Sequence, residues 1–264
     1  MKIVVAGLGK TGTTALFFKV KQAMPADTHC LFEPRGYQTP PVPAEHVLVK
    51  DLFGVHKTLD VASFQSFDRK IVLTRDSRDT LVSRVLYDIY NEPTVCADRS
   101  QVEVFVGILL AKEADPSSTP LRDIIRVFDS MSRRPILPRA TGDAGVALDF
   151  QRRHPDFLPC RYEDFVRSDF RTIESYLGFA MAPGIASVPE ELGRVARTKS
   201  SGDWRNWLVP ADVDFFRPFF TPYLTHNGYA DDWTLPDRPR ILPEHGSAYV
   251  LRLADERRRL TPVS

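Results

Sequence analysis

Gly7-Leu8-Gly9-Lys10-Thr11-Gly12-Thr13-Thr14 is the stretch that decides the fold, because it joins a short apolar run at 3–6 to a helical pattern. A glycine-rich turn between a strand and a helix leaves the first backbone N–H groups of the helix unpaired, and the helix dipole favours an anion there. Lys10 and the three threonine hydroxyls supply further donors. The stretch therefore predicts a site for a phosphate-like group.

Outside this turn, short apolar runs alternate with helical patterns. Strands are predicted at 3–6, 28–32, 46–49, 70–74 and 157–161. Helices are predicted from Gly12, over 78–90, 102–111 and 121–131, and over 163–177 with an end at Gly178. Alternation of this kind implies an α/β fold with a central parallel sheet flanked by helices. The strand-free stretch 92–155 is interpreted as a helical insertion or lid, and 231–264 as a C-terminal tail, of a single domain over 1–264.

The composition excludes several classes of protein. The 264 residues carry 35 Lys and Arg against 34 Asp and Glu, a net charge of +1 that argues against a nucleic-acid partner. Cys30, Cys96 and Cys160 have neither zinc-site nor disulfide spacing and are expected to be buried as small apolar residues. No apolar run is long enough for a signal peptide or a membrane span, so a cytoplasmic protein is expected.

The same glycines also fit a second ligand. Gly7-x-Gly9-x-x-Gly12 matches the dinucleotide fingerprint, and Glu33 follows about 20 residues later, where a ribose-binding acid belongs. A Walker A motif is not formed, because Thr13 rather than lysine follows Gly12. Lys10 and the hydroxyls suit an anion whose leaving oxygen develops charge during a reaction. An NAD(P)-dependent oxidoreductase stays open as the alternative.

A second candidate anion site follows the fourth predicted strand, in Arg75-Asp76-Ser77-Arg78-Asp79-Thr80-Leu81-Val82-Ser83. Carboxyl ends of parallel strands share one edge of the sheet, where ligands bind. The Arg75 guanidinium and the Ser83 hydroxyl suit one phosphate. The simpler interpretation is a helix cap at Asp76 or Ser77 beside solvated arginines.

With both segments, the chain resembles the sulfotransferases that use 3′-phosphoadenosine-5′-phosphosulfate (PAPS), in particular the carbohydrate-type and soluble bacterial enzymes. The segment 10–14 resembles their 5′-phosphosulfate loop, usually Lys-Ser-Gly-Thr-Thr, and Arg75 with Ser83 has their 3′-phosphate spacing. Three more segments resemble the family: Arg161-Tyr162-Glu163-Asp164 near the adenine, Arg197-Thr198-Lys199-Ser200-Ser201-Gly202-Asp203-Trp204-Arg205-Asn206 over the cofactor, and Leu31-Phe32-Glu33-Pro34 of the carbohydrate branch.

The chain departs from the family at identifiable positions. Ala15 stands where many cytosolic members have a tryptophan near the adenine, and Thr198-Lys199 replaces Lys-Gly. The stretch 49–53 lacks the histidine that cytosolic members carry after the third strand. The unmatched stretch 92–155 is expected to set acceptor choice.

The resemblance implies a single P-loop-like domain that transfers a sulfuryl group from PAPS to an acceptor hydroxyl, releases adenosine 3′,5′-bisphosphate (PAP), and needs no metal. The acceptor is expected to be a carbohydrate, glycolipid or small alcohol, with an amine left open. The cofactor-binding residues it implies are Gly9, Lys10, Thr11, Gly12, Thr13, Thr14, Arg75, Ser83, Tyr162, Arg197, Lys199 and Gly202.

Four residues are candidates for catalysis. Lys10 would stabilise the bridging oxygen as it gains charge, and Glu33 would accept the acceptor's proton, with Lys50 as a second cation and His56 as the reserve base. Glu33 as a plain surface carboxylate is the simpler interpretation. A non-catalytic module that binds adenosine bisphosphate stays open too, as does a homodimer.

Overall fold

The computed structural model describes residues 1–34, 44–184, 188–195, 197–198 and 200–260, so the predicted cofactor residue Lys199 lies outside the described residues. The chain divides into two compact units. Unit 1 comprises Met1–Arg75 and Gly145–Gly193, and unit 2 comprises Asp76–Ala144 and Arg194–Ser264.

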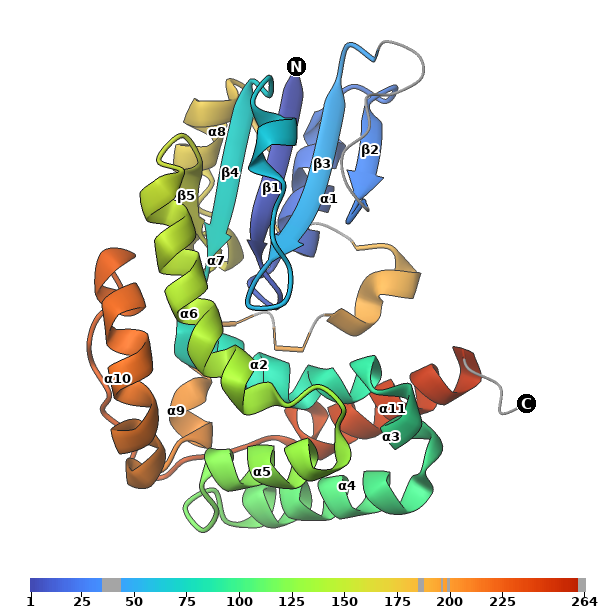
Figure 1. Cartoon of the computed structure of the whole chain (residues 1–264), viewed down its shortest axis with the longest axis vertical. Coiled ribbons are helices and arrows are strands. Elements are labelled where there is room, and N and C mark those ends of the chain that lie inside the picture. Colours follow the sequence, from blue (N-terminus) through green and yellow to red (C-terminus); the bar gives the residue numbers. More distant parts are fainter. Residues whose placement is uncertain (35–43, 185–187, 196, 199, 261–264) are drawn as a thin grey trace. The chain divides into compact units, whose positions relative to one another are not determined.

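Unit 1 contains a five-stranded parallel sheet in the order β2-β3-β1-β4-β5 (Figure 1). Its strands are β1 (Lys2–Leu8), β2 (His29–Phe32), β3 (Val47–Phe53), β4 (Arg69–Thr74) and β5 (Leu158–Arg161). The predicted strands and the α/β fold class are therefore confirmed. The central strands are buried on both faces, which is why they read as continuous apolar runs in the sequence.

Helices cover this sheet through its alternating side chains. Ile3, Val5 and Leu73 belong to one apolar cluster with residues of α1 (Thr13–Ala23) and of α8 (Arg171–Leu177). In addition, Phe53 at the end of β3 stacks on Phe150 of α6 (Ile136–Arg153), with ring centroids 4.4 Å apart. These contacts fix the strand ends from which the site residues project.

The prediction of one helix over 163–177 is wrong. The chain forms α7 (Tyr162–Val166) and α8 instead, and Ser168 between them has φ 59°. Phe165 and Phe170 are both buried, with ring centroids 5.7 Å apart. In one continuous helix, two residues five positions apart point in directions that differ by about 140° around the axis. The break between α7 and α8 therefore allows both rings to pack in the same core. Gly178 ends α8 with φ 81°, as predicted.

Unit 2 is helical. Its helices are α2 (Ser77–Tyr87), α3 (Pro93–Ala97), α4 (Arg99–Ala114), α5 (Leu121–Met131), α9 (Trp204–Trp207), α10 (Pro210–His226) and α11 (Ser247–Leu260), together with the first part of α6. Of the short 3₁₀ helices, η2 (Asp88–Asn91) and η4 (Pro243–His245) belong to unit 2, η1 (Val61–Phe64) belongs to unit 1, and η3 (Glu190–Val195) has residues in both. From Ser77 to Leu86, every residue of α2 is buried. This burial requires the charged residues of α2 to have partners.

The structure also bears on the cysteines and on membrane insertion. Cys96 and Cys160 are buried and Cys30 is half-buried, so the expected burial holds fully for two of the three. Burial raises the pKa of Cys96 to about 11 and that of Cys160 to about 12, which disfavours a reactive thiolate at neutral pH. Within the described part of the chain, no helix combines the length and the apolar character needed to cross a bilayer.

Candidate functional site

The first loop is a tight turn between β1 and α1. Lys10 and Gly12 have φ values of 74° and 95°, and Gly12 is the N-cap of α1. The Thr11 hydroxyl donates to the Leu8 carbonyl at 2.8 Å, so its proton stabilises the turn itself. A Cβ on Gly12 would lie 2.5 Å from Cδ2 of Tyr162. The left-handed conformation and this close approach explain why glycine stands at position 12.

Arg75 and Tyr162 lie against this loop within unit 1. Arg75 Nη1 donates to the Lys10 carbonyl at 3.0 Å, although the two residues are 65 positions apart. The Arg75 guanidinium lies over the Tyr162 ring, with Cζ 4.3 Å from the centroid. Arg75 is 7% exposed, so it is not one of the solvated arginines of the simpler interpretation. Unit 1 thus brings together three of the predicted cofactor residues: Lys10, Arg75 and Tyr162.

Glu33 and Lys50 form an ion pair. Glu33 directly follows β2 with φ 49°, and its N–H donates to the Lys50 carbonyl of β3 at 2.8 Å. Burial lowers the pKa of Lys50, whose side chain is 2% exposed, and the Glu33 carboxylate opposes this shift. The Lys50 ammonium also lies 4.3 Å from the centroid of the Phe32 ring. The candidate base is therefore held beside a buried cation.

His56 lies in a different environment. It is exposed, in a turn after β3 that Gly54 and Lys57 close with two backbone hydrogen bonds of 2.8 and 3.2 Å. Lys57 Nζ reaches the Asp51 carboxylate at 2.5 Å across the same turn. The structure therefore gives His56 a place on an exposed turn rather than in the Glu33–Lys50 pair.

Three further predicted cofactor residues, Ser83, Arg197 and Gly202, belong to unit 2. The Arg197 side chain is 4% exposed, and its Nη1 donates to Asp203 Oδ2 at 2.7 Å and to the His245 carbonyl at 3.1 Å. Its Nε and Nη2 have no hydrogen-bond partner among the described residues. A buried guanidinium with two donor nitrogens that have no partner is a fit for an anionic ligand, because unpaired buried donors are costly.

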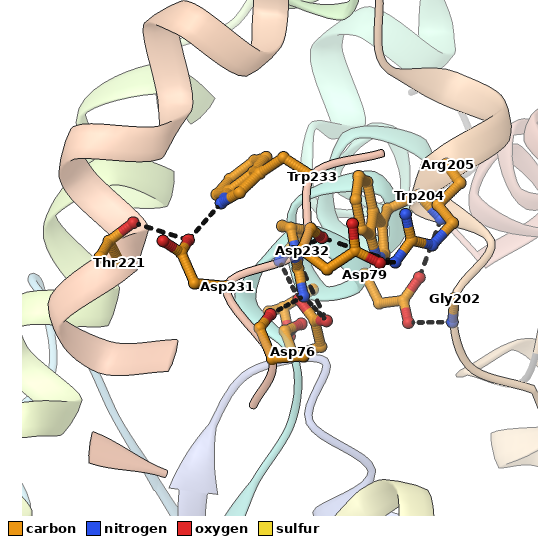
Figure 2. A network of polar contacts seen from close by, with 12 residues as sticks. Asp76, Asp79, Gly202, Trp204, Arg205, Thr221, Asp231, Asp232 and Trp233 are labelled. Atoms are coloured by element: carbon orange, nitrogen blue, oxygen red, sulfur yellow. Dashed lines mark hydrogen bonds and ion pairs between the residues drawn. The ribbon is translucent and has the colours of Figure 1, made fainter. Parts of the chain in front are cut away.

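Ser83 lies on a face of α2 whose neighbouring residues bind Arg194, Gly202 and Trp204. One turn before it, the Asp79 carboxylate accepts the N–H groups of Gly202 at 2.6 Å and Trp204 at 3.0 Å (Figure 2). One turn after it, Tyr87 hydrogen-bonds with Arg194; burial raises the pKa of this tyrosine and Arg194 opposes the shift. Ser83 itself is 5% exposed. Its neighbours on both sides therefore hold the segment that contains Arg197.

Arg78 has a structural role that the sequence did not predict. Asp76 caps α2, as the simpler interpretation expected, by accepting the Arg78 N–H at 2.9 Å, and its carboxylate also pairs with the Arg78 guanidinium. That guanidinium lies over the rings of Trp204 and Trp233, 4.2 and 4.9 Å from their centroids. Because α2 is buried from Ser77 to Leu86, each of its charged residues needs such partners.

Comparisons with known proteins place the fold. No protein-family model matches the chain, and no curated protein matches it. Among solved structures, the chain is similar to the crystal structure of mouse sulfotransferase SULT7A1 complexed with PAP, with a TM-score of 0.53, 15% identity, and coverage of 84% of this chain and 83% of that one. The chain therefore has a sulfotransferase fold.

The order of the sheet argues against the dinucleotide alternative. In the dinucleotide-binding fold, the second strand lies beside the first, so the acid at its end reaches the ribose. Here β3 lies between β1 and β2, which separates Glu33 from the first loop by two strand spacings, about 10 Å. The Glu33 carboxylate is also engaged by Lys50. Glu33 is therefore unsuited to the role that the glycine fingerprint would give it.

Proposed function

We propose that this chain is a PAPS-dependent sulfotransferase. The observation that carries the proposal is the hydrogen bond from Arg75 to the Lys10 carbonyl, because it joins two distant segments that the sequence independently predicts to bind anions. The sulfotransferase fold, shared with a protein crystallised with PAP, supports the same conclusion.

The proposed cofactor residues divide by chemistry. Gly9, Lys10, Thr11, Gly12, Thr13 and Thr14, with the N–H groups that begin α1, hold the 5′-phosphosulfate. Arg75, Ser83, Arg197, Lys199 and Gly202 hold the 3′-phosphate, and Tyr162 lies near the adenine. Arg197 supports this division, since its unpaired Nε and Nη2 form the parallel pair of donors that a phosphate accepts.

PAPS supplies the sulfuryl group and a bisphosphate leaving group. Lys10 stabilises the charge that develops on the bridging oxygen, which is the kind of electrostatic contribution that dominates transfer reactions. Glu33 accepts the proton of the acceptor, and the ammonium of Lys50 pairs with that carboxylate as a second cation at the site. His56 is the reserve base, on its exposed turn.

The proposed acceptor is a hydroxyl of a carbohydrate, a glycolipid or a small alcohol. Support comes from Phe32-Glu33-Pro34, where the candidate base follows an aromatic residue at the end of β2, as in the carbohydrate branch that the sequence resembles. Phe32 is 39% exposed beside that base. An apolar surface next to a base suits the ring face of a sugar or the carbon skeleton of an alcohol.

Ligand-dependent unfolding tests the proposal. PAP at a hundredfold its Kd should add about 2.7 kcal/mol and raise the Tm by about 5 to 10 °C, whereas NAD(H) and NADP(H) should have no effect. Lys10→Ala should reduce the shift. Transfer of labelled sulfuryl from PAPS to sugar or alcohol acceptors then tests activity. A shift with a nicotinamide nucleotide alone would refute the proposed function.

A further inference from the structure

A chain of hydrogen bonds in unit 2 runs from α2 to Arg197. The Asp79 carboxylate, on a residue that is 0% exposed, accepts the N–H groups of Gly202 at 2.6 Å and Trp204 at 3.0 Å. These two residues flank Asp203, whose Oδ2 accepts Arg197 Nη1 at 2.7 Å. Figure 2 shows Asp79 bound to Gly202. Asp79 thus holds the backbone on both sides of the carboxylate that holds Arg197.

The atoms engaged in this chain determine which edge of Arg197 is presented. Arg197 Nη1 donates hydrogen bonds to Asp203 and to the His245 carbonyl. The parallel donors Nε and Nη2 have no partner in the described part of the chain. A guanidinium with a fixed Nη1 presents this edge in one orientation, and bidentate phosphate recognition depends on that orientation. Gly202 adopts φ 85°, so the turn that Asp79 binds has a left-handed backbone that glycine favours.

We propose that Asp79 is a positioning residue for recognition of the 3′-phosphate, acting through Asp203 on Arg197. This inference rests on the proposed function. Asp79 does not touch the ligand in this scheme. It selects for ligands that carry the 3′-phosphate, because it orients the donor pair that binds that group.

The test compares PAP with adenosine 5′-phosphate, which lacks only the 3′-phosphate, by titration calorimetry on the full chain. Asp79→Asn should weaken PAP binding about tenfold, as expected for disturbing a charge-assisted contact, and change adenosine 5′-phosphate binding by less than about twofold. In an Arg197→Ala background, Asp79→Asn should have no further effect on the ratio of the two Kd values. A general loss of structure would instead weaken the binding of both ligands by similar factors.

Asp212 provides a matched control. It is also 0% exposed and accepts backbone N–H groups, from Leu121 at 2.7 Å and from Arg122 and Val209 at 3.1 Å, and it caps other helices of unit 2. Asp212→Asn should lower the Tm and leave the ratio of the Kd values unchanged. If Asp79→Asn does not fold, Asp203→Asn, at a side chain that is 19% exposed, tests the next link with the same ligands.

If Asp79→Asn or Asp203→Asn folds and keeps the wild-type ratio of the two Kd values, the positioning role is overturned. It is also overturned if Asp79→Asn changes this ratio by the same factor in the Arg197→Ala background as in the wild type. Wild-type protein that binds PAP no more tightly than adenosine 5′-phosphate overturns the proposed function itself. Loss of 3′-phosphate preference in Asp79→Asn but not in Asp212→Asn supports the inference.

Discussion

Gly12→Ala should destabilise the protein by about 2 to 4 kcal/mol. The backbone at Gly12 has φ 95°, and a side chain in that region costs about 1 kcal/mol. The new Cβ would also lie 2.5 Å from Cδ2 and 2.7 Å from Cε2 of the Tyr162 ring. Tyr162 is buried against Arg75 and cannot move freely, so overpacking adds about 1 to 3 kcal/mol.

Thermal unfolding measures this cost, with an expected fall in Tm of about 5 to 15 °C. Gly107→Ala is the matched control, because Gly107 lies in α4 with open space around its Cβ position, and alanine should stabilise that helix by about 0.5 to 1 kcal/mol. Tyr162→Ala removes the clash, so in that background the cost of Gly12→Ala should fall to about 1 kcal/mol. Equal stability of Gly12→Ala and Gly107→Ala would refute the account of the first loop.

Three further predictions concern the base, the thiols and a buried lysine. Glu33→Gln should lower turnover by about two to four orders of magnitude while the Kd for PAP stays unchanged, whereas His56→Gln should leave turnover unchanged. Normal turnover of Glu33→Gln would show that Glu33 is not the base. Cys160, with a pKa of about 12, should resist alkylation at pH 8 in the folded protein, whereas the half-buried Cys30 should react first, as peptide mass spectrometry can show. Burial lowers the pKa of Lys112 to about 8. The unfolded chain then binds more protons above pH 8, so the stability of wild type relative to Lys112→Met should rise between about pH 8 and 10.5 in denaturant titrations, and a fall would contradict the shift.

Local patterns in the sequence were sufficient to predict the strands and the first loop. The run before Gly7 and the helix after Gly12 carry their own signals, apolar periodicity and a glycine turn, and both are present in the structure. The predicted helix over 163–177 failed because two buried phenylalanines, Phe165 and Phe170, require a break that local propensity does not reveal.

Features that depend on the order of strands in the sheet, or on contacts between residues far apart in the chain, could not be predicted from the sequence. Glu33 looks like a ribose-binding acid until β3 is found between β1 and β2, where Lys50 reaches it. Asp79 looks like an ordinary residue of the first turn of a helix, but its partners are 123 and 125 positions away. No periodicity links such residues, because the contacts arise only when the helices of unit 2 pack.

The burial of charge in α2 gives these distant contacts a functional meaning. Arg78, Asp79 and Arg84 are each less than 9% exposed, and they pair with Asp76, with two backbone N–H groups and with Asp143. Paired charges in a buried helix rarely stabilise a fold more than well-packed apolar side chains would, because desolvation offsets their attraction. What such pairs supply is geometry: each holds a particular backbone segment at a fixed place on the helix. In α2, Asp79 holds the segment that carries Arg197, and Ser83 lies one turn further along the same face. The paired charges of α2 therefore agree with the proposal that this helix organises a binding site.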